Sequence, residues 1–161
     1  MATARSSADF KAAPSAVYAV VADPARLPEW DVSYSETRVL PSEPGHQLHF
    51  VAHRLLANRE MRLVCRVEQA DPPAHFAFVC EGDAGEQVRA DITLAANGDG
   101  AGTRMTILSE FDLGHADPSA DPLSVVPELT YTQAWLDRSV EQAFAHLGAL
   151  VGAAEERARR A

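Results

Sequence analysis

The segment FKAAPSAVYAVVADPARLPEW, residues 10–30, decides the fold because it places two short helices directly after a strand. Residues 16–21 carry apolar side chains at helical spacing, and Pro14 suits the first turn of that helix. Asp23-Pro24 ends the helix, because the residue before a proline disfavours helical backbone. We therefore expect a second short helix over residues 25–30 and a strand over residues 7–12.

Five segments beyond this opening have the composition of strands. In the fourth of them Val88, Ile92 and Leu94 alternate with polar side chains, which predicts a strand with one buried and one wet face. Turns rich in glycine and proline separate the segments, so consecutive strands are expected to form an antiparallel meander. The predicted strands cover residues 48–53, 61–68, 76–80, 88–95 and 105–113.

The C-terminal part predicts one long helix. A loop rich in Pro, Asp and Ser covers residues 115–122, and Pro127 precedes a stretch with helical periodicity. Its apolar face consists of Leu129, Leu136, Val140, Phe144, Leu147 and Val151. The chain is thus expected to form a single α+β domain over residues 1–161. In this helix-grip fold a curved antiparallel sheet of six to seven strands surrounds the long helix and leaves an apolar hollow.

Composition excludes several classes of function. The net charge of −9 argues against a nucleic-acid partner, which needs a basic face, and against docking on an anionic membrane. The N-terminal residues 1–11 have no apolar core and so predict no signal peptide, and no stretch is long enough to span a bilayer. We therefore expect a cytoplasmic protein.

The two cysteines, Cys65 and Cys80, lie in apolar strand segments. Their spacing is not that of a metal motif. Two buried thiols in a reducing compartment are the favoured interpretation, and a disulfide between neighbouring strands is the alternative.

The opening segment and residues 33–40, 64–67 and 109–113 together resemble the START/Bet v 1-like (SRPBCC) superfamily. The similarity extends from about residue 10 to residue 150, and it is closest to polyketide cyclase/dehydrase and aromatase/cyclase members. The resemblance implies a catalytic tyrosine at Tyr34 and a catalytic arginine at Arg66. Leu27 occupies the place of the family's pocket tryptophan, and Trp30 lies one turn later. Strand alternation puts Arg66 on the polar face unless a bulge turns it inward.

Ligand-binding residues are expected on the apolar faces around the hollow. Trp30 and Trp135 are large rings that form either a wall against a flat ligand or part of the core. Ser109 is a polar residue on an apolar strand face and bonds either a ligand or the backbone. The full predicted set is Trp30, Phe50, Ser109, Phe111, Trp135, Leu136 and Val140.

No cofactor or metal is predicted. His49 and His53 share a strand direction, but no third ligand is in register with them. The sequence also contains no phosphate-binding loop, dinucleotide fingerprint or nucleophile elbow.

Two functions remain as hypotheses. The first is a cofactor-free cyclase/aromatase of secondary metabolism that binds a hydrophobic polyketide, delivered by an acyl carrier protein, and promotes cyclisation and dehydration. The alternative is a non-catalytic carrier, sequestering or self-resistance protein for a hydrophobic metabolite. Ionisable side chains that point into the hollow favour the first, and a purely apolar lining favours the second. Either a monomer or a homodimer is compatible with the sequence.

Overall fold

The computed structural model describes residues 2–56, 59–98, 100–112 and 122–160. Seven strands precede one long helix, and two short helices and a 3₁₀ turn follow the first strand. The elements are β1 Ala2–Phe10, α1 Pro14–Val21, η1 Pro24–Arg26, α2 Leu27–Trp30, β2 Tyr34–Val39, β3 His49–Leu56, β4 Arg59–Asp71, β5 His75–Gly82, β6 Gln87–Ala96, β7 Thr103–Asp112 and α3 Pro122–Arg160. The α+β helix-grip architecture is confirmed.

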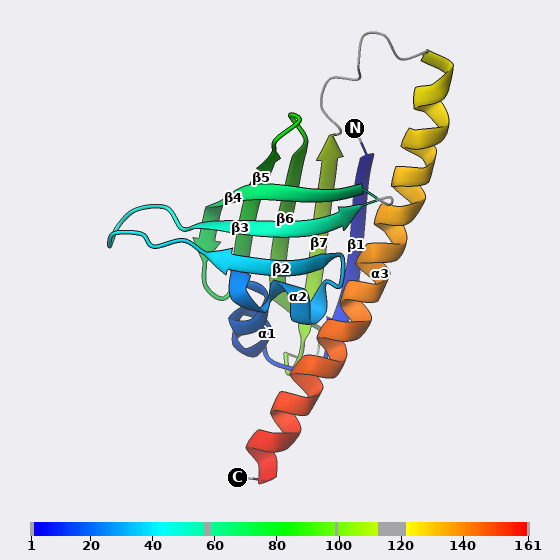
Figure 1. The fold of residues 1–161 in the computed structure, drawn as a ribbon. Helices are drawn as coiled ribbons and strands as arrows, with labels where there is room; N and C mark the ends of the chain where they lie inside the picture. Colours follow the sequence, from blue (N-terminus) through cyan, green and yellow to red (C-terminus); the bar gives the residue numbers. More distant parts are fainter. Residues whose placement is uncertain (1, 57–58, 99, 113–121, 161) are drawn as a thin grey trace.

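All seven strands belong to one antiparallel sheet with the order β1-β7-β6-β5-β4-β3-β2. Strands β2 to β7 form the expected meander. The last strand, β7, also pairs with the N-terminal strand β1. The sheet bends strongly, so that β2, β3 and β4 run across the direction of β5, β6, β7 and β1 (Figure 1). Strand twist produces this curvature, and it gives the sheet an inner face toward the helices.

One row of side chains crosses the inner face from β3 to β1. Its members are paired in register from strand to strand, and each is at most 4% exposed. This row is the continuous floor of the core. It consists of Phe50, Cys65, Cys80, Val88, Phe111 and Ala2.

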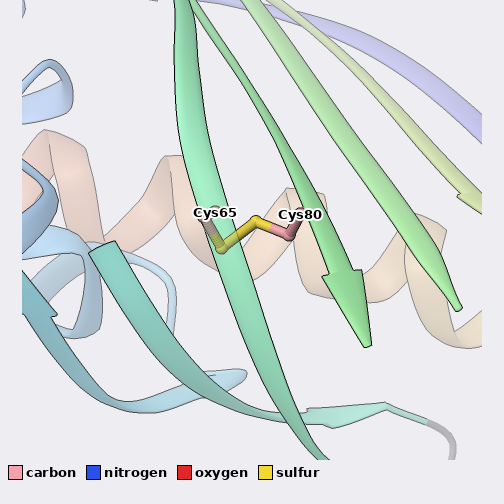
Figure 2. The surroundings of a disulfide bond; sticks show 2 residues. All are labelled: Cys65 and Cys80. Carbon is pink, nitrogen blue, oxygen red and sulfur yellow. A yellow bond between two sulfur atoms is a disulfide. The ribbon is translucent and has the colours of Figure 1, made fainter. Parts of the chain in front are cut away.

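Cys65 and Cys80 form a disulfide within this row, and this corrects the expectation of two separate thiols. Figure 2 shows the sulfur bridge between the neighbouring strands β4 and β5. The reason lies in a bulge: the register of the hairpin shifts by one residue between Val67 and Gln69. Beyond the shift Cys65 stands directly opposite Cys80, whereas the unshifted register would place it opposite Glu81.

Helix α3 begins at Pro122, ahead of the expected start after Pro127. It runs beside the edge strand β1 (Figure 1). The side-chain amide of Gln133 donates to the backbone oxygen of Thr3 (2.7 Å) and accepts from its N–H (3.0 Å). Nearer the C-terminus, the rings of Phe10 and Phe144 are 6.2 Å apart. In the described part of the chain, no helix is both long and apolar enough to cross a membrane.

Side-chain hydrogen bonds attach the segment of the short helices to strands β2 and β7. The Asp23 carboxylate accepts from the N–H of Ala25 and caps η1. Thr37 of β2 donates to the carbonyl of Pro24 (2.6 Å), and buried Thr103 of β7 donates to the carbonyl of Ala12 (2.7 Å). These bonds hold α2 over one end of the inner face.

The strand boundaries differ from the sequence expectation, most clearly in the first strand and at the end of the last strand. The first strand covers Ala2–Phe10 instead of residues 7–12. The last strand ends at Asp112, and Leu113 of the predicted segment 105–113 lies outside the described residues, as does most of the loop 115–122.

Candidate functional site

An inner cavity lies between α2, α3 and the inner face of the sheet. Apolar side chains form most of its wall, and five polar residues reach it from β2, β3, β7, α2 and α3. Its free volume is about 20 Å³, which is room for about one water molecule. The lining residues are Leu27, Trp30, Asp31, Tyr34, Arg54, Phe78, Val88, Ala90, Ile92, Ile107, Ser109, Ser139, Val140 and Ala143.

A β-bulge turns Tyr34 toward this cavity. Along β2 the register with β3 shifts between Tyr34 and Glu36, so that Ser35 is the extra residue. Both Ser35 and Glu36 are exposed, and Tyr34 is buried. In a regular strand without the bulge, Tyr34 and Glu36 would share one face, and Tyr34 would face solvent.

Arg54 of β3 is the direct cross-strand partner of Tyr34. Its guanidinium carbon lies 4.7 Å from the centre of the Tyr34 ring and 5.9 Å from that of Trp135. Arg54 is only 3% exposed, so its charge is held within the core. Cation–π contacts of this kind offset part of the desolvation of a buried cation.

A hydrogen-bonded chain fixes the position of Arg54. Its Nε donates to Ser33 Oγ (3.0 Å), and the Ser33 hydroxyl donates to Asp31 Oδ1 (2.6 Å). The N–H of Ser33 also donates to Asp31 Oδ1 (3.1 Å). The donors and acceptors of these hydrogen bonds are mutually consistent, because the Ser33 hydroxyl accepts from the Arg54 cation and donates to the Asp31 carboxylate.

The environment keeps the Tyr34 phenol protonated. Burial raises the pKa of Tyr34 to about 12, against the ordinary value of 10.0. The nearby Arg54 cation lowers this pKa, and the Asp31 carboxylate raises it again. At neutral pH Tyr34 is therefore a neutral hydrogen-bond donor, and not a base.

Trp30 contributes a second donor. The residue is 3% exposed and lines the cavity, and its indole Nε1 has no hydrogen-bond partner among the residues that the structure describes. A buried N–H without a partner is uncommon in folded proteins, and it invites a polar group of a bound molecule.

A larger vestibule lies outside the inner cavity. It has a volume of about 340 Å³, within the range of small-molecule sites. Ser139 of α3 lines both spaces, and Ser33 connects the vestibule wall to Arg54. Two apolar residues of the vestibule, Val32 and Leu55, are 55% and 47% exposed. The vestibule is formed by Val32, Ser33, Leu55, Trp135, Arg138, Ser139 and Gln142.

The structure brings together most, but not all, of the residues predicted from sequence. Tyr34, Trp30, Ser109 and Val140 line the inner cavity, and Trp135 lines the vestibule. Three others are buried in the core outside the lining of both spaces. Phe50 packs behind Phe78 with ring centres 5.4 Å apart, and Phe111 and Leu136 are almost inaccessible. These three are Phe50, Phe111 and Leu136.

Arg66, the predicted catalytic arginine, lies on the opposite face of the sheet. The bulge in β4 lies after Arg66, between Val67 and Gln69, so Arg66 keeps the outward orientation that regular alternation along the strand predicts. Its guanidinium is paired with Glu68 (3.3 Å) and Glu81 (3.7 Å) and lines a groove of about 260 Å³ on the outer face. Arg66 therefore does not reach the inner cavity.

Sequence reasoning missed Arg54. The predicted strand 48–53 ends one residue before Arg54, whereas β3 extends to Leu56. A signal was present, because Phe50, Ala52 and Arg54 alternate on one face and a strand one residue longer would have included the arginine.

Comparison with known proteins identifies the family. The description "Polyketide cyclase / dehydrase and lipid transport" belongs to a family model that matches residues 1–152. No curated protein sequence matches the chain at a significant level.

Several solved structures share the fold. TTHA0849 from Thermus thermophilus has a TM-score of 0.74 and 20% identity, with 94% of this chain and 98% of that chain covered. A START superfamily protein from Mycobacterium smegmatis has a TM-score of 0.68 and 11% identity, with 93% and 97% covered. SA2116 from Staphylococcus aureus has a TM-score of 0.69 and 11% identity, with 96% of both chains covered. At these identities the likeness concerns the fold, and the family match supplies the assignment. The chain belongs to the polyketide cyclase/dehydrase and lipid transport family.

Proposed function

We propose that this protein is a cofactor-free cyclase that binds a hydrophobic polyketide-like substrate in the inner cavity and promotes ring closure and loss of water. The observation that carries this proposal is the inward position of Tyr34 beside Arg54. A cavity that only stored an apolar metabolite would have no use for a neutral phenol and a guanidinium in contact with each other.

The reaction places specific demands on the site. An activated methylene carbon of the substrate gives up a proton to water, and its electron pair forms a carbon–carbon bond to a ketone carbon. Negative charge then develops on the ketone oxygen, which Tyr34 stabilises by donating a hydrogen bond and Arg54 by its charge. Water returns the proton to this oxygen, which becomes a hydroxyl group. Loss of that hydroxyl group with a neighbouring proton releases water and leaves a double bond in the ring. No electrons are transferred to an external acceptor, so the protein's own task is to position the chain and stabilise charge.

The two spaces indicate how a substrate is accommodated. The inner cavity has room for about one water, whereas the vestibule has the volume of a small ligand. We propose that the substrate enters at the vestibule and separates α3 from β2 and β3 as its reacting end reaches Tyr34. Ser139, which lines both spaces, lies on this path.

The test is turnover of linear poly-β-ketone thioesters, followed by mass spectrometry for the loss of one water. Tyr34→Phe is expected to lower the rate by about 10²–10³-fold, the usual effect of removing one donor to a developing oxyanion. Tyr18→Phe is the matched control, because Tyr18 packs edge-on against Phe76 with ring centres 6.5 Å apart and does not line the cavity.

The two arginines can be distinguished in the same assay. Arg54→Ala is expected to abolish turnover, and Arg66→Ala to leave it close to wild type, because Arg66 lies on the outer face. If Arg66→Ala abolished turnover and Arg54→Ala did not, Arg66 would be the catalytic arginine. Retention of the compounds without loss of water would instead favour the carrier function.

A further inference from the structure

We propose that the molecule bound at this site is a planar acid, with a carboxylate or enolate oxygen that Arg54 binds as its counter-ion. This inference rests on the proposed function only in using the same cavity. It names the chemical class of the ligand and holds whether or not the ligand is transformed.

The first argument is the charge of Arg54. A guanidinium has five N–H donors, and a buried one is costly unless it is paired. Arg54 uses Nε for Ser33, and no carboxylate lies within ion-pair distance of it among the residues whose side chains the structure describes. Asp31, the nearest acid in the hydrogen-bonded chain, is reached only through the Ser33 hydroxyl. Among these side chains the cation is thus oriented by Ser33 and not neutralised by direct contact.

The second argument is the geometry of the remaining donors. With Nε tied to Ser33, the two terminal nitrogens of Arg54 form the fork that suits a carboxylate or a 1,3-dicarbonyl enolate. Both of those anions are planar groups with two oxygens. Trp30 Nε1, buried in the same cavity without a partner, supplies a further donor that a second oxygen would satisfy.

The third argument is the shape of the surroundings. The aromatic rings of Tyr34 and Trp135 lie 4.7 Å and 5.9 Å from the Arg54 guanidinium carbon. Beyond them the cavity wall is formed by apolar side chains such as Ile92, Ile107 and Val140. Once α3 has separated from β2 and β3 as proposed above, these side chains match a flat hydrocarbon body with its anionic group at one end, whereas a neutral lipid leaves the cation without a partner.

The experiment compares matched acids and neutral analogues. The chain's two tryptophans are Trp30, which lines the cavity, and Trp135, which lines the vestibule, so intrinsic fluorescence reports occupancy directly. The probes are 1-hydroxy-2-naphthoate and its methyl ester, titrated into the full chain. We expect the acid to bind at least about tenfold more tightly than the ester, the effect of one charge-assisted hydrogen-bond pair.

Variants show whether Arg54 is responsible. Arg54→Gln should bind acid and ester equally, and Arg54→Lys should retain part of the preference because it keeps the charge without the fork. Arg89→Gln, on the outer face and paired with Glu68 and Asp91, should keep the full preference. Circular dichroism verifies that each variant is folded.

Equal affinity of acid and ester in the wild type would overturn the proposal, as would binding of neither compound. A preference for the acid that survives in Arg54→Gln would also overturn it. Failure of the proposed function is a separate result. If the protein binds the acid selectively but releases no water from linear substrates, acid binding by Arg54 is supported and the cyclase function is refuted.

Discussion

The protonation of Tyr34 leads to a prediction about stability at high pH. Below about pH 10 the phenol is protonated in both the folded and the unfolded chain, so it contributes nothing to the pH dependence. Between pH 10 and 12 the unfolded chain loses the proton while the folded chain retains it, since burial raises the folded pKa to about 12. The free energy of unfolding therefore falls over this range. Two pKa units correspond to about 2.7 kcal/mol in total, and about 1.3 kcal/mol of it is lost between pH 9 and pH 11.

Urea unfolding of the wild type and of Tyr34→Phe, followed by fluorescence at about pH 9 and pH 11, measures this quantity. The wild type should lose about 1.3 kcal/mol more than the variant. Tyr18, whose pKa burial also raises, is present in both proteins and cancels from the comparison. Equal losses in the two proteins would show that Tyr34 is hydrated in the folded state, and the argument for a buried neutral donor would fail.

Three further perturbations test other parts of the structure. Reduction of the disulfide, which closes a loop of 15 residues, should lower the free energy of unfolding by about 3 kcal/mol, and equal urea midpoints for the oxidised and reduced chains would contradict it. Ser33→Ala should destabilise the protein by about 1–3 kcal/mol and weaken acid binding, because it leaves the Nε of Arg54 without a partner. Calorimetry measures the loss of stability, and the naphthoate titration measures the loss of affinity. Leu147→Ala should cost about 2–5 kcal/mol because the side chain anchors α3 in the core, whereas Glu141→Ala on the exposed side of the same helix should remain within about 0.5 kcal/mol in urea unfolding.

Much of the fold could be predicted from periodicity. The central strands and the long helix have strong apolar alternation, so their existence and order followed from the sequence. The beginning of β1 was missed because its buried side chains are Ala2 and Ala4, which are too small to give a marked apolar pattern. Strand β2 is an edge strand whose residues beyond Tyr34 are mainly polar, and no strand was predicted there, because the family resemblance of residues 33–40 concerned only the role of Tyr34.

The site was harder to predict because it depends on the bulge in β2. This bulge, with Ser35 as the extra residue, turns Tyr34 to the inner face. A second bulge, after Val67, places Cys65 opposite Cys80 and explains the disulfide. A bulge changes which face a side chain occupies without changing the composition of the strand, so alternation alone gives the wrong face on one side of it.

The position of Arg54 connects the fold to the proposed chemistry. A buried cation is commonly neutral or unfavourable for stability when compared with an apolar side chain of similar size. The fold therefore gains little from Arg54, and its Nε bond to Ser33 serves mainly to orient the guanidinium toward the cavity. The same bulge that turns Tyr34 inward also places its ring under this guanidinium, so donor and cation are fixed as a unit. Such an arrangement is useful for binding or stabilising an anionic oxygen, and it is the feature that separates this cavity from a purely apolar container.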